Sequence, residues 1–561
     1  MRCAPRSRLF SPPAWRWFQP PDRCRQGLLL RRRDTCETLQ TLNQTFAGEN
    51  FNPFAAVGRL DFTLGGIYEP LEIFTVAGGG HTYPWLATSY KWQTGFRAVK
   101  VNLRKGVKWS DGKPFTSADV VFTFAYGKKY KVDPTGLTTN GEIKSVTASG
   151  KYGVVFHFSS VNTTLLPTLL SQIFIVPQHV FKNIKNPLTA VIKKPVGTGP
   201  FTKVVSYSPQ EYILGKNPRY WKKLHYDGIK VPALATNQAA LNAMLAKQMD
   251  WMPVAIQHVQ QALVNHDKKH LHYFYAHQTT PLGIYLPDEK YPYNQPALRI
   301  AISLSLKRND INNKGENGTE PPSDALGVSE LWPKWVSKST AKKAASLAKF
   351  NPGKAIKILK ADHFSIKKGT LVDKNGKEVK IVLTCPSDFS DWVLSMDVIK
   401  TDLKSIGIHA TTNEYPFQQW GPDREFRRLN NAFFWTPQSG PTPYNYFFAY
   451  MDKSTYTKPG QDAMKNQWGN LTGWWSPKAT RLLAKWRQTD NMSTQKKIAG
   501  QLENIQLTQM PFIPTVYQSQ WDDYSTLHFT GFPSASHFYA QGTAYTYPDD
   551  LKVLTSVKPV K

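Results

Sequence analysis

Residues 99–124 hold the sequence feature that most narrowly constrains the fold of this chain. Apolar and polar side chains alternate over residues 99–103, as they do in a strand with one buried face. The turn-forming sequence Ser-Asp-Gly-Lys follows at 110–113. Thr116 then stands three residues before Asp119, which is the spacing of a capping box at a helix start. A strand, a tight turn and a capped helix in one short segment are typical of an α/β fold.

Strand and helix signals continue to alternate along the rest of the chain. We expect helices over residues 236–249, 296–308 and 390–406, the last of them followed by Gly407, which suits a left-handed cap. Further signals are helix starts at Asn351-Pro352, Ser476-Pro477 and Ser493, and a hairpin turn at Asn375-Gly376 between Val372 and Val379. A single core rarely grows beyond about 300 residues, so 561 residues must divide among several packed units.

The composition excludes several classes of protein. Hydrophobic residues make up 41% and charged residues 20% of the chain, which excludes wholesale disorder. Because no stretch approaches the ~20 uninterrupted apolar residues of a membrane helix, we do not expect an integral membrane protein. Four cysteines cannot form a disulfide scaffold for a chain of this length.

The net charge of +30, from 70 basic and 40 acidic residues, raises the question of nucleic-acid binding. That function needs basic residues clustered with stacking aromatics on one face. Here the lysines are scattered through every segment after Lys91, and no RNA-recognition, zinc-finger or basic-zipper pattern occurs. We therefore expect no nucleic-acid partner. The charge fits a basic surface that works in an acidic medium or against an anionic cell envelope.

Residues 1–36 differ from the rest of the chain. They contain nine arginines, no lysine and three of the four cysteines. The apolar run Leu28-Leu29-Leu30 is too short for a secretory signal, which needs 7–15 apolar residues, so a signal peptide is not evident. We interpret this segment as an atypical basic leader or tail outside the folded body, either a disordered tail or a start site that misses the true leader. The remaining Cys385 leaves the body without an internal disulfide.

The sequence contains no enzymatic signature. A Gly-x-Ser-x-Gly elbow, a phosphate-binding loop and a His-Glu-x-x-His motif are all absent. Pro200 directly follows Gly197-Thr198-Gly199, so this segment favours a structural turn over a dinucleotide fingerprint. His266, His270 and His272 form a cluster in which a histidine pair four residues apart on a helix could hold a metal. Because no cysteine or third close ligand stands nearby, the cluster favours a solvated basic face. We expect no cofactor and no metal.

Tryptophan is unusually abundant, with 17 residues in the chain. Several of these residues stand in loop-like contexts, namely Trp420, Trp435, Trp468, Trp474 and Trp475. Indole faces stack well on sugar rings and on peptide side chains, so a wide cleft lined by aromatic residues is one interpretation. Packing within the core or between lobes is the other, and both stay open.

Several segments, in their order along the chain, resemble the extracytoplasmic solute-binding proteins of ABC importers, in the peptide/nickel group called family 5. The block 103–124 is similar to the signature block of that family. The other similar stretches are 68–71, 84–90, 195–201, 217–221, 298–308, 351–352, 407–408 and 511–514. Each stretch alone is modest, but the ordered set is specific and spans nearly the whole body.

The resemblance implies an α/β periplasmic-binding-protein fold of type II, with two lobes joined by a hinge and an extra inserted domain. The expected division is residues 37–75, 187–285 and 520–561 for lobe I, 76–186 for the inserted domain, and 286–519 for lobe II. It further implies a monomer outside the cytoplasmic membrane that closes on a ligand, docks on the permease subunits of an importer and breaks no bond.

The resemblance also indicates where the ligand binds. In the family's peptide binders, a Gly-Trp pair is followed three residues later by an aspartate that pairs with the ammonium group of the peptide. Here Gln438 stands three residues after Trp435, and residues 431–451 contain no acidic side chain. A neutral amide suits hydroxyl groups, so both an oligopeptide and a neutral oligosaccharide stay open as ligands, and nickel is less favoured. The residues expected to line the cleft are Trp435, Gln438, Tyr444, Trp420 and Trp474.

Two functions from other classes compete with this interpretation. An extracellular hydrolase of the same polymers would need two carboxylates that face each other across the cleft. A chaperone-like or adhesion role driven by the charge would give salt-sensitive binding to anionic polymers.

Overall fold

The computed structural model describes most of the chain between residues 38 and 560. Within that span, the residues not described are 42–45, 47, 56–57, 76–79, 134, 136, 140, 235, 329, 388, 417–418, 422–423, 425–431, 438–439, 462–469 and 545. The predicted leader or tail, 1–36, lies outside the described residues. Among the helices described, none is both long and apolar enough to cross a membrane.

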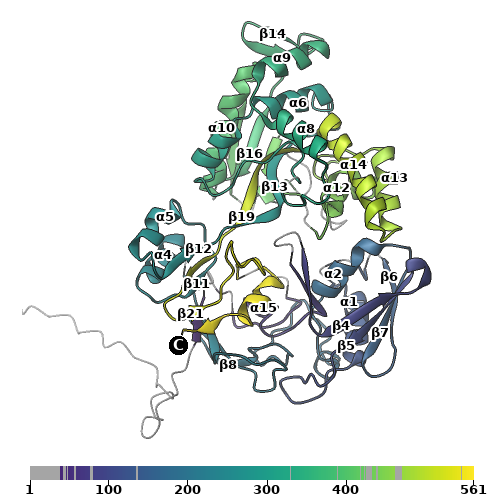
Figure 1. The fold of residues 1–561 in the computed structure, drawn as a ribbon, viewed down its shortest axis with the longest axis vertical. Coiled ribbons are helices and arrows are strands. Elements are labelled where there is room, and N and C mark those ends of the chain that lie inside the picture. Colours follow the sequence, from purple (N-terminus) through teal and green to yellow (C-terminus); the bar gives the residue numbers. More distant parts are fainter. Residues whose placement is uncertain are drawn as a thin grey trace, which may run out of the picture.

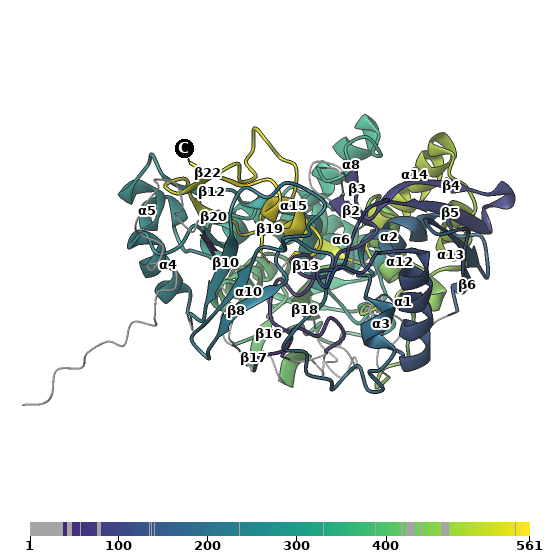
Figure 2. The same cartoon turned by 90° about the horizontal axis from the view of Figure 1, so that it is seen from below.

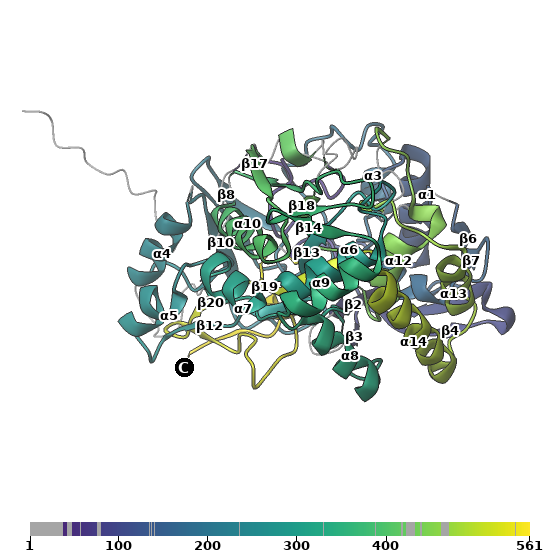
Figure 3. The same cartoon turned by 90° about the horizontal axis from the view of Figure 1, so that it is seen from above.

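A mixed five-stranded sheet forms the core of the largest body of the molecule, drawn in the upper part of Figure 1. Its strand order is β17 (Thr411–Tyr415), β16 (Val382–Pro386), β18 (Ala432–Trp435), β13 (Ala276–Tyr285) and β19 (Ile513–Gln520). Strand β16 is parallel to β17 and β18, whereas β13 is antiparallel to β18 and β19. The helices of this part, several of which lie over the sheet in Figure 3, are α6 (Pro296–Ser305), α7 (Arg308–Asp310), α8 (Lys338–Ala348), α9 (Pro352–Ala361), α10 (Ser390–Leu403), α12 (Tyr444–Met451), α13 (Pro477–Arg487) and α14 (Met492–Gln509).

A second body is built on an antiparallel four-stranded sheet. The strands are β4 (Ala87–Trp92), β5 (Ala98–Leu103), β7 (Gly153–Phe158) and β6 (Ile143–Ala148), in that order. The helices beside it are α1 (Ser117–Tyr130), α2 (Leu166–Ser171) and α3 (Gln178–Phe181). Helix α1 contributes Val120 and Phe124 to a buried cluster with Val99 and Val101 of β5. Figure 2 shows α1 alongside these strands.

The remaining sheets pack beside these two bodies. One has the order β1 (Thr38–Gln40), β10 (Gly228–Pro232), β9 (Glu211–Gly215) and β8 (Lys203–Tyr207); another has the order β11 (Trp251–Met252), β20 (Asp523–Ser525) and β12 (Leu271–Tyr273), next to α4 (Asn237–Leu245) and α5 (Val259–Ala262). The two-stranded pairs are β2 (Glu72–Thr75) with β3 (His81–Pro84), β14 (Ser365–Lys367) with β15 (Thr370–Val372), and β21 (Phe529–Thr530) with β22 (Lys558–Pro559), and the last helix is α15 (Asp549–Leu554).

Two long strands connect the three-stranded sheet to the five-stranded sheet. Strand β12 leads within a few residues into β13, and β19 leads into β20. Strands β13 and β19 pair with each other and run together between the upper and lower parts of Figure 1. Their pairing contains two register shifts. The two parts of the molecule are therefore linked by a pair of adjacent strands.

The local elements expected around residues 99–124 are confirmed. Strand β5 buries residues 99, 101 and 103 and exposes the residues between them. The side chain of Thr116 accepts a hydrogen bond from the N–H of Ala118 at 3.3 Å, and Asp119 Oδ2 accepts one from the N–H of Thr116 at 2.9 Å. Because these two bonds satisfy amides that the first turn leaves free, they fix the start of α1.

Thr116→Ala is expected to lower the free energy of unfolding by about 1–2 kcal/mol, because the capping bond to the first turn of α1 is lost. Thr494→Ala is the matched control, since Thr494 is exposed in the first turn of α14 without serving as its cap. Urea unfolding followed by circular dichroism measures both variants. Equal stability of the two variants would show that the Thr116 cap contributes nothing.

Other expected starts and stops agree with the structure, and some boundaries differ. Asn351 caps α9, Ser476 caps α13, and Gly407 adopts a left-handed φ of 78° after α10 and a short 3₁₀ turn. The expected helices 236–249 and 296–308 end earlier, at Leu245 and Ser305. The residue after the second of these, Leu306, has extended backbone.

One expected helix start was wrong, and one expected hairpin is shorter than predicted. Asn491, not Ser493, caps the last long helix, because its side chain accepts the N–H of Thr494 at 2.9 Å. The hairpin turn at Asn375-Gly376 is present: the N–H of Asp373 donates to Lys377 O at 2.8 Å, the N–H of Val379 donates to Leu371 O at 2.9 Å, and an antiparallel bridge joins Val372 and Glu378. The apolar run after it does not extend the hairpin, because β16 starts at Val382 and pairs instead with β17 and β18.

A buried carboxyl, that of Glu69, joins segments that follow different sheets. Glu69 accepts hydrogen bonds from Trp85 Nε1 at 2.6 Å, Tyr220 OH at 2.9 Å and Trp221 Nε1 at 3.4 Å. Burial raises the pKa of Glu69 to about 7, although these donors oppose the rise. Trp85 follows β3, and Tyr220 and Trp221 follow β9. The carboxyl therefore ties segments from different sheets together.

Candidate functional site

A cavity of about 980 Å³ lies where α4, α5, the start of α10 and the end of β19 meet, and we call it the Trp392 cavity. Its wall carries side chains from both sides of the strand pair β13–β19. Amide side chains are prominent in this wall, namely Asn237, Gln238, Gln257, Asn317 and Gln518. Amides donate and accept hydrogen bonds without charge, so they suit peptide bonds and sugar hydroxyls alike.

Three aromatic residues add apolar faces to the Trp392 cavity: Phe389, Trp392 and Trp521. The first two flank the start of α10, and Trp521 follows β19 directly. The Trp392 ring lies edge-on to Phe389, with ring centroids 5.1 Å apart. Rigid aromatic faces beside amide groups are a common composition of sites for small ligands.

The charged side chains of the Trp392 cavity are acidic. Asp61 and Asp391 line it, and none of its described lining residues is a lysine, arginine or histidine. Asp61 accepts a hydrogen bond from Tyr547 OH at 3.4 Å, and Arg59 lies over the Tyr547 ring at 5.7 Å. Burial raises the pKa of Asp61 to about 6, against the opposing effects of Tyr547 and Arg59. Asp61 thus has a hydrogen-bond donor, Tyr547, and a basic residue, Arg59, close to its carboxyl.

Asp391 is in a different environment, at the N-terminal turn of α10. Its Oδ1 accepts the N–H of Trp392 at 3.0 Å. Burial raises the pKa of Asp391, and no basic side chain contributes an opposing effect. Ser395, one turn further along α10, donates a hydrogen bond of 2.6 Å to Glu316 Oε1. The carboxyl of Glu316 is therefore held about one helical turn from Asp391.

The segment that carries Glu316 packs tightly on α10. A Cβ atom at Gly315 would lie 2.0 Å from Ser395 Oγ, so only glycine allows this approach. Glu316 is 2% exposed, and burial together with the charge of Asp391 raises its pKa to about 8. Glu320 is equally buried, and its Oε1 accepts the N–H of Ser519 at 3.2 Å. Asp391, Glu316 and Glu320 are thus close enough to interact electrostatically, although Asp391 alone of the three lines the Trp392 cavity.

A second cavity of about 790 Å³, the Tyr547 cavity, lies next to the first. Gly440, Pro441 and Asn445 line it from the body of the five-stranded sheet, and residues of α1, α2 and the 131–138 turn line it from the other side. Tyr547 lines this cavity and donates to Asp61, which lines the Trp392 cavity. The two cavities are therefore neighbours separated by that contact.

Trp420 and Trp435, two of the residues expected to bind ligand, pack next to the wall of the Trp392 cavity without lining it. Trp435 is half-buried at the end of β18, with its ring centroid 5.6 Å from those of Trp392 and of Trp420, which is fully buried. Arg424 Cζ lies 3.8 Å from the Trp435 centroid. Among the described residues that line the two cavities, neither tryptophan is present. Their role in binding stays a prediction.

Tyr444 and Trp474 are also part of the packing of the large body. Tyr444 is buried in α12, stacked on Phe448 with centroids 5.5 Å apart, and its neighbours Gly440, Pro441 and Asn445 line the Tyr547 cavity. Trp474 is half-buried against the same core. Gln438 lies outside the described residues, so its role stays a prediction.

Sequence reasoning missed Asp391, Trp392 and Trp521 as residues of the cavity wall. Asp391 and Trp392 stand in the expected helix 390–406, and the helical pattern gives no sign that its first turn faces a cavity. Trp521 lies near the expected boundary between lobe II and lobe I at residue 520, and this position was the available signal.

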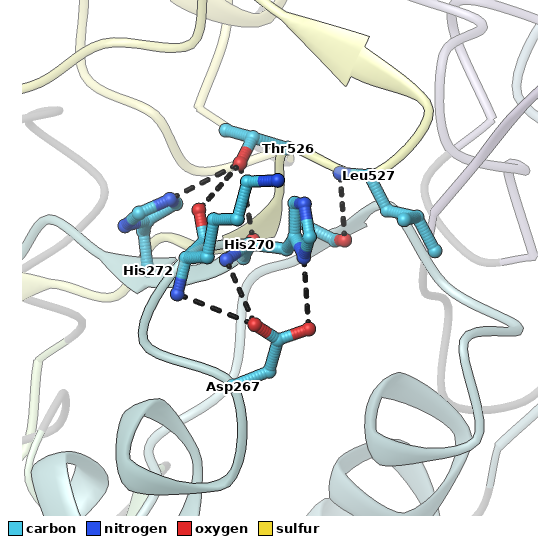
Figure 4. A network of polar contacts seen from close by, with 7 residues as sticks. Asp267, His270, His272, Thr526 and Leu527 are labelled. Atoms are coloured by element: carbon cyan, nitrogen blue, oxygen red, sulfur yellow. Dashed lines mark hydrogen bonds and ion pairs between the residues drawn. The ribbon is translucent and has the colours of Figure 1, made fainter.

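The histidine group 266–272 forms a local polar network (Figure 4). Asp267 Oδ2 contacts His270 Nδ1 at 2.9 Å, and Thr526 Oγ1 contacts His272 Nε2 at 3.1 Å. In the part of the chain that the structure describes, no group of three or more His, Cys, Asp or Glu residues could hold a metal ion. The solvated basic face expected for residues 266–270 stays the interpretation of this segment.

Curated relatives match the chain at moderate identity. A probable ABC transporter-binding protein of Deinococcus radiodurans is 24% identical over 543 residues, which cover 88% of this chain and 86% of that protein. The oligopeptide-binding protein AppA of Bacillus subtilis is 31% identical over 179 residues, 30% of this chain and 32% of AppA. Two further relatives, from Sinorhizobium fredii and Agrobacterium fabrum, match over 28% and 29% of their own lengths.

Solved structures share the fold over nearly the whole chain. A periplasmic oligopeptide-binding protein of Thermotoga maritima has a TM-score of 0.82 at 23% identity, over 94% of this chain and 100% of that chain. The mannohexaose-bound crystal structure of the Thermotoga protein has a TM-score of 0.75. AppA of B. subtilis in complex with a nonapeptide has a TM-score of 0.69 at 20% identity, over 93% and 99% of the two chains. The mixed α/β fold that the resemblance implied is confirmed.

The matched family model decides the classification. The model for the middle region of the bacterial extracellular solute-binding proteins of family 5 matches residues 81–458, more than half of the chain. The family consists of solute-binding proteins rather than enzymes, in agreement with the interpretation of the sequence. The chain therefore belongs to family 5 of the bacterial extracellular solute-binding proteins.

Proposed function

We propose that this protein captures an oligopeptide or an oligosaccharide outside the cytoplasmic membrane and delivers it to the permease subunits of an ABC importer, acting as a monomer. The observation that carries the proposal is the Trp392 cavity, whose amide and aromatic side chains come from both sides of the β13–β19 strand pair. A ligand held there contacts both parts of the molecule at once. Binding is therefore coupled to their relative position.

Closure about the strand pair is the proposed motion, and the division into lobe I, the inserted domain and lobe II is part of the proposal. A contact outside the strand pair supports it. Thr163 Oγ1 donates hydrogen bonds to the carbonyl oxygens of Arg487 at 3.3 Å and Thr489 at 2.9 Å, between the body of the four-stranded sheet and the end of α13. These bonds form when the parts approach and break when they separate.

The chemistry of the wall of the Trp392 cavity and the ligands of the relatives favour two ligand classes, peptides and sugar chains. Amides and indole faces suit both an extended peptide and a sugar chain. The nonapeptide in AppA and the mannohexaose in the Thermotoga protein agree with both ligands. Two carboxyls, Asp61 and Asp391, do line the cavity, so a hydrolase control belongs in every binding experiment.

Calorimetric titration of the protein with short peptides and with manno-, cello-, xylo- and chito-oligosaccharides tests the proposed function. We expect saturable binding to at least one panel and a smaller radius of gyration of the bound protein in X-ray scattering. Chromatography of the ligand afterwards is expected to show no cleavage. Binding to neither panel, or turnover of the ligand, would contradict the proposal.

Trp521→Ala is expected to weaken ligand binding at least tenfold, because it removes an aromatic face of the Trp392 cavity next to the β19 crossing. Trp475→Ala is the matched control: Trp475 is also half-buried, but it contacts Lys453 in the body of the five-stranded sheet and does not line either cavity. Calorimetry on both variants measures the effect. Similar losses in the two variants would place the ligand elsewhere.

A further inference from the structure

We propose that Asp391 binds a primary ammonium group of the ligand, so that the Trp392 cavity selects solutes with a free amine over their uncharged analogues. The inference rests on the proposed function and specifies one chemical group of the ligand, a primary ammonium. Ammonium groups of two sources fit: the N-terminus of a peptide and the amine of an amino sugar. Both join a positive charge to a mostly uncharged, hydrogen-bonding body.

The first observation is the sign of the charge in the wall. The chain carries +30 overall, yet the described lining of the Trp392 cavity has two aspartates and no basic residue. A low-dielectric cavity lined by one sign of charge concentrates ligands of the opposite sign. The wall therefore favours a cation and disfavours a ligand carboxylate.

The second observation separates the two aspartates. Asp61 is hydrogen-bonded to Tyr547, with Arg59 over the Tyr547 ring. Asp391 accepts the backbone N–H groups of Trp392 and of its own residue, and within the described ranges it makes no ion pair and no hydrogen bond with another side chain. Its carboxyl oxygens thus retain the capacity to accept bonds from a ligand. Asp391 is the better anchor for a cation.

The third observation is the pair of carboxyls behind Asp391. Glu316 is held through Ser395, which lies one turn along α10 from Asp391. Glu320 is 2% exposed, and its Oε2 has no hydrogen-bond partner. The backbone N–H of Ser519 fixes the other oxygen of Glu320, and the adjacent residue Gln518 lines the cavity.

These carboxyls lack a counter-ion within the described chain. Burial and neighbouring carboxyls raise the pKa of both Glu316 and Glu320, and no lysine or arginine contributes an opposing effect. With a pKa of about 8, Glu316 holds a proton at pH 6 and adds no negative charge behind Asp391. The negative charge that attracts a ligand cation is therefore that of Asp391 itself, whose pKa no basic side chain lowers.

The aromatic faces complete the fit. Phe389 and Trp392 flank Asp391 in the sequence and line the same cavity, with Trp521 across from α10 at the end of β19. An ammonium group is attracted to the face of an indole ring as well as to a carboxylate. The amide side chains around it bind the uncharged remainder of the ligand.

Two matched ligand pairs test the inference, because acetylation removes the charge of the amine and preserves the rest of the ligand. The pairs are tetra-alanine amide with its N-acetylated form, and the glucosamine tetramer with the N-acetylglucosamine tetramer. Calorimetry with the full chain is carried out at about pH 6, where the amines are protonated. In the class that binds, we expect the free amine to bind at least tenfold more tightly, as for a charge-assisted contact.

Asp391→Asn is expected to reduce this preference to less than about threefold. An unchanged circular dichroism spectrum and melting temperature show that the variant folds. Asp397→Asn, an exposed change on the same helix, is expected to keep the full preference. Equal binding of both ligands of a pair by the wild type overturns the inference and leaves the proposed function intact. So does a preference that survives Asp391→Asn or that Asp61→Asn abolishes instead. If none of the four ligands and no member of the earlier panels binds, the proposed function itself fails.

Discussion

Gly197→Ala is expected to lower the free energy of unfolding by about 3 kcal/mol or more, because the new methyl group has no room. A Cβ atom at Gly197 would lie 2.0 Å from the carbonyl oxygen of Ile67 and 2.8 Å from its carbonyl carbon. Backbone atoms cannot turn aside as a flexible side chain can. The whole contact between two chain segments must therefore shift.

Neighbouring hydrogen bonds make such a shift costly. The carbonyl oxygen of Gly197 accepts the N–H of Ser110 at 2.9 Å, and the N–H of Gly199 donates to Ile67 O at 2.9 Å. Moving the turn away from Ile67 breaks the bond from Gly199 and displaces the bond from Ser110, and buried groups left without partners add to the loss. These bonds tie the segment after β5 to the turn and the turn to the chain before β2.

The matched control for this change is Gly500→Ala. Gly500 is in the interior of α14, and a Cβ atom there would meet nothing within 4 Å. Alanine is a better helix former than glycine, so this variant is expected to be more stable by about 1 kcal/mol. Urea unfolding of both variants gives the comparison. A Gly197→Ala variant as stable as the wild type would mean that the close approach to Ile67 is not required.

The protein is expected to be more stable at about pH 5.5 than at about pH 8, because several buried carboxyls hold a proton in the native state. Burial raises the pKa of Glu69 and Asp549 to about 7, and that of Glu316 and Glu503 to about 8. In the unfolded chain these groups ionise near pH 4. Between the two values, only the native state binds the proton.

The direction of the pH dependence follows from this difference. Wherever the native state binds more protons than the unfolded state, the free energy of unfolding falls as the pH rises. The fall therefore starts near pH 4.5 and ends near pH 8, above which both states are ionised. One pKa unit corresponds to about 1.4 kcal/mol, so a shift of two to three units in one carboxyl contributes on the order of 3 kcal/mol.

Glu503→Gln isolates one contribution from the whole. Glu503 is 1% exposed in α14, and its Oε1 has no hydrogen-bond partner. Glutamine stays neutral at every pH, so the variant is expected to lose less stability between pH 5.5 and pH 8 than the wild type does. Asp397→Asn, at an exposed ion pair with Lys400, is expected to leave the slope unchanged.

Thermal unfolding at moderate salt measures these slopes. The salt screens the repulsion within a chain of net charge +30, which grows as histidines become protonated at low pH. Equal slopes for the wild type and Glu503→Gln would contradict the assignment of a raised pKa to Glu503. A wild-type protein that is more stable at pH 8 would contradict the whole account.

Local signals were the most dependable part of the sequence. The alternation over 99–103, the capping box at Thr116 and the left-handed Gly407 each depend on residues a few positions apart, and each is present in the structure. The expected hairpin at Asn375-Gly376 is present but short, because the strand beginning at Val382 is paired by distant segments instead. Pairing partners far along the chain outweigh a local turn preference.

The candidate site depends on contacts between distant segments even more than the strand pairing does. The resemblance to the family placed the acidic anchor of its peptide binders next to Trp435, but residues 431–451 contain no acidic side chain. The structure places carboxyls at 61 and 391 in one cavity wall, with Trp521 nearby. No periodicity or spacing links these positions, because hundreds of residues separate them along the chain.

The sequence by itself determined the helices and strands with local start and stop signals, the mixed α/β class, and, through its ordered motifs, the family. Only the tertiary structure decided which side chains share the Trp392 cavity. That choice depends on the pairing of β13 with β19 and on the fit of Gly315 against Ser395. Both are contacts between distant segments, and such contacts are set by the close packing of the whole fold rather than by the residues beside them.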